Sequence, residues 1–217
     1  MSEINFRPWV GKNYLSDGYK GKHILVLGES HYCEKELEQG GRCCPFCKKE
    51  NMKDDCFSQT EDVIDSFVYD YSGESYHQTF LCFERAVLGK ELTQKEREDF
   101  WQGVIFYNYI QYSQSGPRTA PQPEHWEKSE LAFKELLQEY LPDYIIVWGV
   151  RLYEGLPGWD GEHSLLQISE NDYADVWIYN VNGKRIPALK VYHPSCPKGK
   201  SWSYWHDVYE EFWKLKV

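Results

Sequence analysis

Two adjoining segments decide the fold: Ser129-Glu130-Leu131-Ala132-Phe133-Lys134-Glu135-Leu136-Leu137-Gln138-Glu139-Tyr140-Leu141 and, after Pro142-Asp143, Tyr144-Ile145-Ile146-Val147-Trp148-Gly149. In the first, apolar residues recur at intervals of three and four, which is the spacing of an amphipathic helix. The second is short and apolar, as expected of a strand buried on both faces. A helix followed by such a strand is half of a parallel crossover unit. The sequence therefore predicts an α/β domain with a mostly parallel central sheet and helices on both faces.

The rest of the chain extends this pattern. Strands are expected at 23–28, 104–109, 144–148, 176–180 and 187–192, and helices at 60–70, 77–88, 93–102, 128–140 and 201–214. Asn182-Gly183 is typical of a tight hairpin turn, so an antiparallel pairing of the last two strands is the alternative to a parallel one. The loop Ser115–Pro123 is either part of a substrate channel or a plain surface connection.

Length and composition set limits on the function. A chain of 217 residues is expected to form one domain, 1–217. No segment approaches the roughly 20 apolar residues needed to cross a bilayer, so a soluble, cytoplasmic monomer without membrane contact is expected. The formal net charge of −10 argues against general affinity for nucleic acid but allows a local basic face. The 17% aromatic content is expected to serve packing more than base stacking.

Two strand exits carry dense polar chemistry. Ile24-Leu25-Val26-Leu27 runs into Gly28-Glu29-Ser30-His31-Tyr32, and Leu189-Lys190-Val191-Tyr192 runs into His193-Pro194-Ser195-Cys196-Pro197-Lys198-Gly199-Lys200-Ser201-Trp202. Open α/β sheets bind their ligands at the carboxyl ends of the strands. These two fragments are therefore the first candidates for a functional site.

Together the two fragments resemble the uracil-DNA glycosylase superfamily, whose members carry a Gly-led motif after the first core strand and a His-Pro-Ser motif after the last. Gly28-Glu29 is similar to the first motif, and His193-Pro194-Ser195 matches the second. Phe106-Tyr107-Asn108-Tyr109 resembles the family's strand ending in Asn, and Tyr144–Gly149 its central strand ending in Gly. Ser30 stands where one branch has a catalytic Asp, and His31 replaces Pro. The resemblance implies a three-layer, glycosylase-like fold.

The resemblance also implies roles for the motif residues. His193 would donate a hydrogen bond to the departing base, and Glu29 would orient water or face the cationic sugar. Asn108 would read a pyrimidine edge and Tyr32 would wall the pocket, with Ser30 and His31 beside them. Each has a plain alternative, such as a turn cap for Glu29 or a backbone bridge for Asn108. His31 is also a possible metal ligand.

The loop after His193 is the expected DNA-entry edge. Lys198 and Lys200 would contact phosphates, and Ser195 and Ser201 would add donors near a helix start. Trp202 would fill the gap left by an extruded base, or else pack as the first core residue of the last helix.

A cysteine cluster forms an insertion at 33–56. It holds Cys33, Cys43, Cys44, Cys47 and Cys56. Cytosolic thiols rarely form disulfides, and Cys44-Pro45-Phe46-Cys47 has the spacing of a zinc knuckle. A structural zinc held by Cys33 (or Cys43), Cys44, Cys47 and Cys56 is expected, with free thiols or an iron–sulfur cluster as alternatives.

The leading hypothesis is a monofunctional DNA glycosylase, a base-excision repair hydrolase. It would flip uracil or a related modified pyrimidine out of DNA and need no cofactor for chemistry. A glycosylase-like module that binds a nucleobase or nucleic acid without cutting is the alternative, supported by Ser30 in place of Asp. A protein-interaction domain that uses the aromatic surface is the third.

Overall fold

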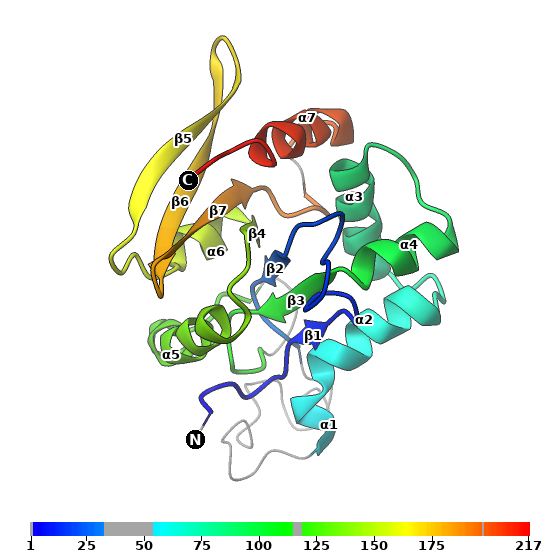
Figure 1. The fold of residues 1–217 in the computed structure, drawn as a ribbon. Helices are drawn as coiled ribbons and strands as arrows, with labels where there is room; N and C mark the ends of the chain where they lie inside the picture. The colour runs from blue at the N-terminus through cyan, green and yellow to red at the C-terminus, as the bar shows by residue number, and fades with distance from the viewer. Residues whose placement is uncertain (1, 33–53, 115–118, 197) are drawn as a thin grey trace.

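The computed structural model describes residues 2–32, 54–114, 119–196 and 198–217. Their strands form one seven-stranded sheet in the order β1-β3-β2-β4-β7-β6-β5 (Figure 1). The strands are β1 (Trp9–Val10), β2 (Ile24–Gly28), β3 (Val104–Asn108), β4 (Tyr144–Trp148), β5 (Glu162–Ser169), β6 (Asp172–Val181) and β7 (Lys184–Val191). The helices are α1 (Asp54–Phe57), α2 (Gln59–Tyr69), α3 (His77–Leu88), α4 (Gln94–Trp101), α5 (Pro123–Tyr140), α6 (Val150–Gly155) and α7 (Trp202–Phe212). The α/β class is confirmed.

The sheet is mixed, with parallel strands at its centre and antiparallel strands towards its edges. The central strands β3, β2, β4 and β7 pair in parallel. At the edges, β1 pairs antiparallel with β3, and β5, β6 and β7 form an antiparallel meander. The β6–β7 connection follows the alternative expected from its turn, because Asn182 and Gly183 have φ angles of 52° and 80°. Positive φ at both central residues is the geometry of a two-residue hairpin turn.

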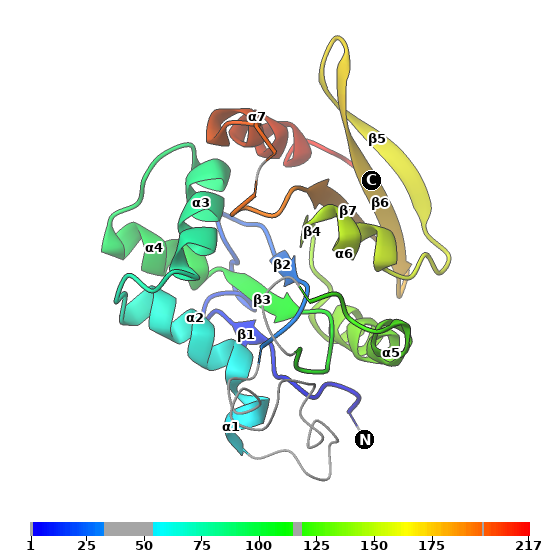
Figure 2. The same cartoon turned by 180° about the vertical axis from the view of Figure 1, so that it is seen from behind.

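Alternate residues of β2 face two separate hydrophobic clusters. Ile24 and Val26 belong to the cluster that holds apolar residues of α2, α3, α4 and α7. Leu25 and Leu27 belong to the other, which holds residues of α5 and α6. Since successive strand side chains point to opposite faces, helices pack against both faces of β2. Figures 1 and 2 show the two groups of helices on opposite sides of the central strands.

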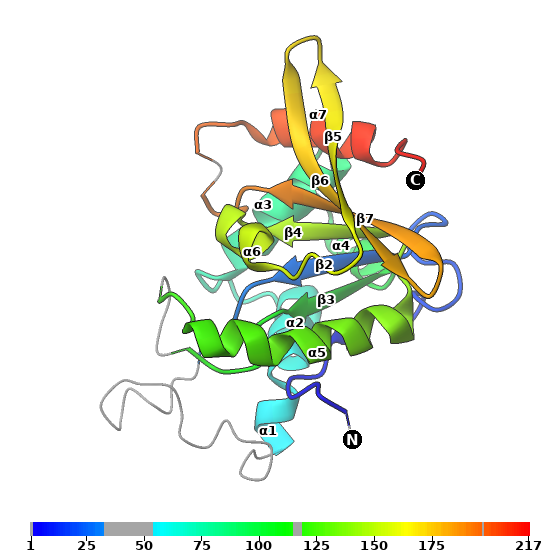
Figure 3. The same cartoon turned by 90° about the vertical axis from the view of Figure 1, so that its left-hand side faces the viewer.

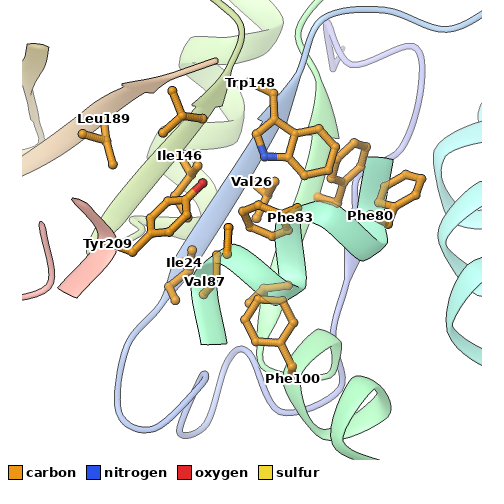
Figure 4. Packing of buried hydrophobic residues seen from close by; sticks show 14 of the residues in the cluster. Ile24, Val26, Phe80, Phe83, Val87, Phe100, Ile146, Trp148, Leu189 and Tyr209 are labelled. Atoms are coloured by element: carbon orange, nitrogen blue, oxygen red, sulfur yellow. The ribbon is translucent and has the colours of Figure 1, made fainter. Parts of the chain in front are cut away.

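Aromatic rings fill the larger cluster. Phe83 lies 4.9 Å from the ring of Trp148, and Phe80 lies 5.6 Å from it (Figure 4). Trp101 is fully buried between the helices of this face and makes edge contacts with Phe67 and Phe80. Much of the aromatic excess therefore serves core packing, in agreement with the sequence analysis.

The sequence analysis missed β1, β5, α1 and α6. Most side chains of strand β5 are exposed, and its sequence has no continuous apolar run. Its pattern therefore resembles that of a loop. It pairs only with β6, and this hairpin projects beyond the body of the domain (Figures 1 and 3). Helix α5 begins at Pro123, five residues before the expected start, with the proline in its first turn. No described helix has the length and apolar character needed to span a membrane.

Candidate functional site

Four strand ends meet at one edge of the sheet. Strands β2, β3, β4 and β7 are parallel neighbours, so their carboxyl ends lie together. Gly28 at the end of β2 is directly opposite Asn108 at the end of β3. At the other junction, Trp148 pairs with Val191, two residues before His193. The predicted motif residues of separate fragments are thus brought to a single edge.

Asn108 lies over the backbone of Gly28. A Cβ atom at residue 28 would come within 2.3 Å of Asn108 Oδ1 and 3.1 Å of the Phe106 ring. A larger residue at position 28 would therefore have to displace the Asn108 side chain from its present place. Asn108 is half-buried, and its Nδ2 lies 3.4 Å from the His31 ring nitrogens.

His31 is a buried residue of this edge, with 4% of its surface exposed. Its Nε2 lies 2.9 Å from Thr60 Oγ1, and its ring centroid is 4.5 Å from that of Phe6. Burial lowers the pKa of His31 to about 3, so the ring is neutral at physiological pH. Thr60 and Asn108 both lie beside the ring nitrogens. A metal role for His31 stays a prediction, because Cys33, Cys43, Cys44 and Cys47 lie outside the described residues.

Glu29 forms a two-point ion pair with Arg151, a residue that the sequence analysis missed. Arg151 Nε donates to Glu29 Oε1 at 2.7 Å, and the second hydrogen bond joins Arg151 Nη2 to Oε2. Arg151 lies in the first turn of α6, directly after β4, and the contact raises its pKa. The signal that could have found it is its place two residues after Gly149, at the end of the central strand.

His193 lies two residues after the end of β7. Its Nδ1 lies 2.8 Å from Ser195 Oγ, and its ring meets Trp148 edge-on with 6.3 Å between centroids. Desolvation by the surrounding protein lowers the pKa of His193, and the negative charge of Glu29 opposes that shift. The imidazole is therefore neutral at physiological pH, and Glu29 lies within electrostatic reach of it.

Ser30 and Tyr32 complete the first fragment. Ser30 Oγ is buried and makes no hydrogen bond within the described part of the chain. Tyr32 is exposed and is fixed through its backbone, which bridges to Gln114 and accepts a hydrogen bond of 2.8 Å from Gln59. Its side chain lies within electrostatic reach of Arg151, and its role as a pocket wall stays a prediction.

No protein-family model and no curated protein matches this chain significantly. The functional argument therefore rests on the motifs and on the geometry of this edge. The resemblance to the uracil-DNA glycosylases remains an expectation from the motifs alone.

The predicted DNA-entry residues form three cation–aromatic pairs. Lys198 Nζ lies 5.3 Å from the ring centroid of Tyr192, and Lys200 Nζ 3.8 Å from that of Tyr204. The guanidinium of Arg85, from α3, lies 4.7 Å from the Trp202 ring. We call these six residues the basic–aromatic surface. Trp202 is 39% exposed, so it is not the buried core residue that the sequence offered as its alternative.

The two serines of this region have partners in the protein. Ser201 caps α7 by accepting a hydrogen bond of 3.1 Å from the Tyr204 backbone N–H. The Ser195 hydroxyl forms a hydrogen bond with His193 Nδ1. These contacts therefore indicate that Ser201 stabilises the start of α7 and that Ser195 orients the imidazole of His193.

The expected zinc ligands fall mostly outside the described residues. Cys33, Cys43, Cys44 and Cys47 lie there, whereas Cys56 lies in α1. Within the described ranges, no group of three or more His, Cys, Asp or Glu side chains is arranged to hold a metal ion. The structural zinc stays a prediction from the cysteine spacing.

Proposed function

We propose that this protein is a DNA glycosylase that hydrolyses the N-glycosidic bond of uracil or a related modified pyrimidine. The observation that carries the proposal is the meeting of Glu29, Asn108 and His193 at the carboxyl edge of parallel strands. A carboxylate, an amide and a neutral imidazole are the groups that such a hydrolysis needs.

The reaction assigns a task to each group. The C1′–N bond breaks with its electron pair going to the base, while a water oxygen bonds to C1′ and the water proton ends on the base. The sugar becomes cationic in the transition state, and Glu29 supplies the opposite charge. When the Ser195 hydroxyl donates to His193 Nδ1, the ring proton lies on Nε2, where it can donate to the carbonyl oxygen of the departing base.

A second candidate function is supported by the ion pair of Glu29. A carboxylate that is held by Arg151 through two hydrogen bonds is partly neutralised and less free to activate water. Ser30 also stands where an acidic side chain would otherwise add a second carboxylate. Both features favour a module that binds a nucleobase or nucleic acid without cutting it.

Replacement of His193 tests the enzyme proposal. We expect His193→Ala to lower single-turnover excision by about 100- to 1000-fold, the usual loss when one donor to a developing anion is removed. The assay would use single- and double-stranded oligonucleotides that carry a panel of modified bases. His163→Ala is the matched control, because His163 is exposed and lies within hydrogen-bond distance of Asp175 on the projecting hairpin.

Two further variants separate the roles. Glu29→Gln should reduce excision by roughly 10- to 1000-fold if the carboxylate orients water or faces the sugar. Asn108→Asp exchanges an amide donor for an acceptor and should change the ranking of preferred bases. Wild-type rates for both His193→Ala and Glu29→Gln on the best substrate would show that the site is assigned wrongly. Absence of excision with retained base-dependent binding would favour the non-catalytic module.

A further inference from the structure

Arg151 uses only part of its hydrogen-bonding capacity. A guanidinium carries five N–H donors in a fixed plane. The pair with Glu29 takes one from Nε and one from Nη2. Within the described residues no other acceptor contacts Arg151, so both donors on Nη1 and one on Nη2 remain for a ligand.

The two partners differ in their exposure. The Glu29 side chain is 16% exposed, whereas the Arg151 side chain is 50% exposed. The carboxylate is therefore anchored within the site edge, and the outer side of the guanidinium faces solvent. Surface ion pairs are usually weak and mobile, but a two-point contact with a half-buried acid fixes the orientation of the arginine.

The surroundings of Arg151 favour an anion. Arg151 follows the end of β4 at the same edge as His193 and Asn108, and Tyr32 lies within electrostatic reach of it. In a chain with a formal net charge of −10, an oriented cation at this edge offsets the repulsion that a phosphate would otherwise meet. A planar arginine fork matches the geometry of phosphate oxygens.

We propose that Arg151 binds the phosphate of the nucleotide whose base enters the site, with Glu29 as the residue that positions it. This inference rests on the proposed function, because it takes the same edge as the nucleotide site. Arg151 contacts the ligand and Glu29 acts through Arg151. The phosphate is then held from the first turn of α6, and the base by Asn108 at the end of β3 and His193 after β7.

The test compares charged and neutral phosphates. The wild-type protein would be titrated with fluorescent oligonucleotides that carry an abasic-site analogue. In a series of these oligonucleotides, one phosphate at a time near the abasic site would be replaced by a neutral methylphosphonate. We expect one methylphosphonate to weaken wild-type binding by about 10- to 100-fold, the usual effect of losing a hydrogen bond to a charged group. Arg151→Gln should show the same loss with the unmodified strand and no further loss with that methylphosphonate.

Arg185→Gln is the matched control. Arg185 is likewise ion-paired with a glutamate, Glu162, and its side chain is 47% exposed, but it lies at the opposite end of β7. This variant should bind like the wild type and keep its sensitivity to the methylphosphonate. Thermal unfolding of each variant would show that the fold is kept. Binding of deoxyuridine 5′-monophosphate relative to deoxyuridine would show whether a free nucleotide can supply the phosphate.

The outcomes separate this inference from the proposed enzyme. If Arg151→Gln binds like the wild type, or stays equally sensitive to every methylphosphonate, the phosphate role is wrong even if the wild type excises bases. If binding depends on Arg151 as expected but no base is excised, the phosphate site stands and the glycosylase proposal fails. A wild-type protein that binds neither the oligonucleotides nor the free nucleotide overturns the inference.

Discussion

His31 combines a titratable side chain with almost complete burial. Its ring is enclosed by Phe6 and Thr60 and touches Asn108. Because burial lowers its pKa to about 3 from the ordinary 6.5, the folded protein holds the ring neutral where the unfolded chain binds a proton. This difference makes the folded state sensitive to acid.

We expect the free energy of unfolding to fall as the pH drops below 6.5. Between that value and the lowered pKa of His31, the unfolded state binds one proton more, so His31 alone contributes a slope of about 1.4 kcal/mol per pH unit. Urea unfolding of the wild type and of His31→Gln at pH 7.5, 6.5, 5.5 and 4.5 would isolate this contribution. The difference in stability between the two proteins should stay constant above pH 6.5 and shift in favour of the variant below it. A constant difference down to pH 4.5 would contradict the neutral, buried ring.

Single residues at the site differ in how far the sequence could predict them. Glu29 and His193 follow apolar runs directly, so local patterns place them at the ends of buried strands. Arg151 meets Glu29 across 122 residues of chain, and no local pattern indicates such a contact. The burial of His31 depends on Phe6 and on Thr60 of α2, which only the folded chain brings together.

At the scale of elements, the turn between β4 and α6 sets the position of Arg151. Gly149 occupies it with φ 110° and ψ 142°, a conformation that side chains other than glycine rarely adopt. A Cβ atom at residue 149 would meet no other atom within 4 Å. Glycine is therefore favoured at this position by the backbone conformation alone. A change at Gly149 therefore alters the path from β4 into the helix that carries Arg151.

Gly149→Ala should lower both stability and ligand binding. The strained conformation is expected to cost about 1–3 kcal/mol of unfolding free energy, and relaxation of the turn should move Arg151 away from Glu29. Gly183→Ala is the control, because Gly183 also has a positive φ, 80°, and open space, but lies in the β6–β7 turn. Urea unfolding and oligonucleotide titration of both variants would check this. Equal binding losses in the two variants would remove the special role of the β4–α6 turn.

A buried ion pair joins α3 to α4. Arg97 donates to Glu84 through Nε and Nη2, the latter at 2.9 Å, and Trp101 Nε1 donates to the same carboxylate at 3.3 Å. Both charged side chains are almost fully buried, and burial raises the pKa of Glu84. Loss of one partner would leave an uncompensated charge in the core.

Arg97→Met should destabilise the protein by about 3–5 kcal/mol, because Glu84 would remain buried without its partner. Adding Glu84→Gln should recover part of that loss, since the amide is neutral and still accepts from Trp101. A double-mutant cycle by urea unfolding would measure the coupling. If the double variant is as unstable as the sum of the single ones, the pair is not coupled as the structure indicates.

The sequence predicts elements well where burial leaves a strong pattern. The continuous apolar runs of β2, β3 and β4 and the amphipathic repeat of α5 fix their type and order. Strand β5 pairs with β6 and buries Leu166 while most of its other side chains are exposed, and β1 is only two residues long. Local patterns therefore indicate the antiparallel β6–β7 turn at Asn182-Gly183, but not the edge strands β1 and β5.

Charge distribution is the property of the whole molecule that bears most on DNA binding. The chain carries a formal net charge of −10, so a DNA face must be a local exception. The basic–aromatic surface brings Lys198, Lys200 and Arg85 together from two distant parts of the sequence. Cations beside an exposed indole and two half-buried phenol rings suit contacts with phosphates and with a stacked base.

The double variant Lys198→Ala/Lys200→Ala should bind DNA more weakly and less salt-dependently. The slope of log affinity against log salt concentration is expected to decrease in magnitude by about one to two units. Each phosphate contact releases counterions when DNA binds, so a variant with fewer contacts releases fewer of them. Excision at saturating enzyme should be largely kept. Titration of a fluorescent oligonucleotide at several salt concentrations would test this, with Lys90→Ala/Lys95→Ala on the α4 side as a charge-matched control. An unaltered slope would place the DNA face elsewhere.

The parallel pairing of β2 with β3 and β4 also has a consequence for how the protein folds. Strand β2 ends at Gly28, whereas its two partners begin at Val104 and Tyr144. Long chain segments must therefore be ordered before these strands can pair, and such non-local pairing is slow. The β5–β7 meander closes through short local turns instead. We expect the meander to form early and the candidate site to be completed last, so partly folded or C-terminally shortened chains would lack it altogether.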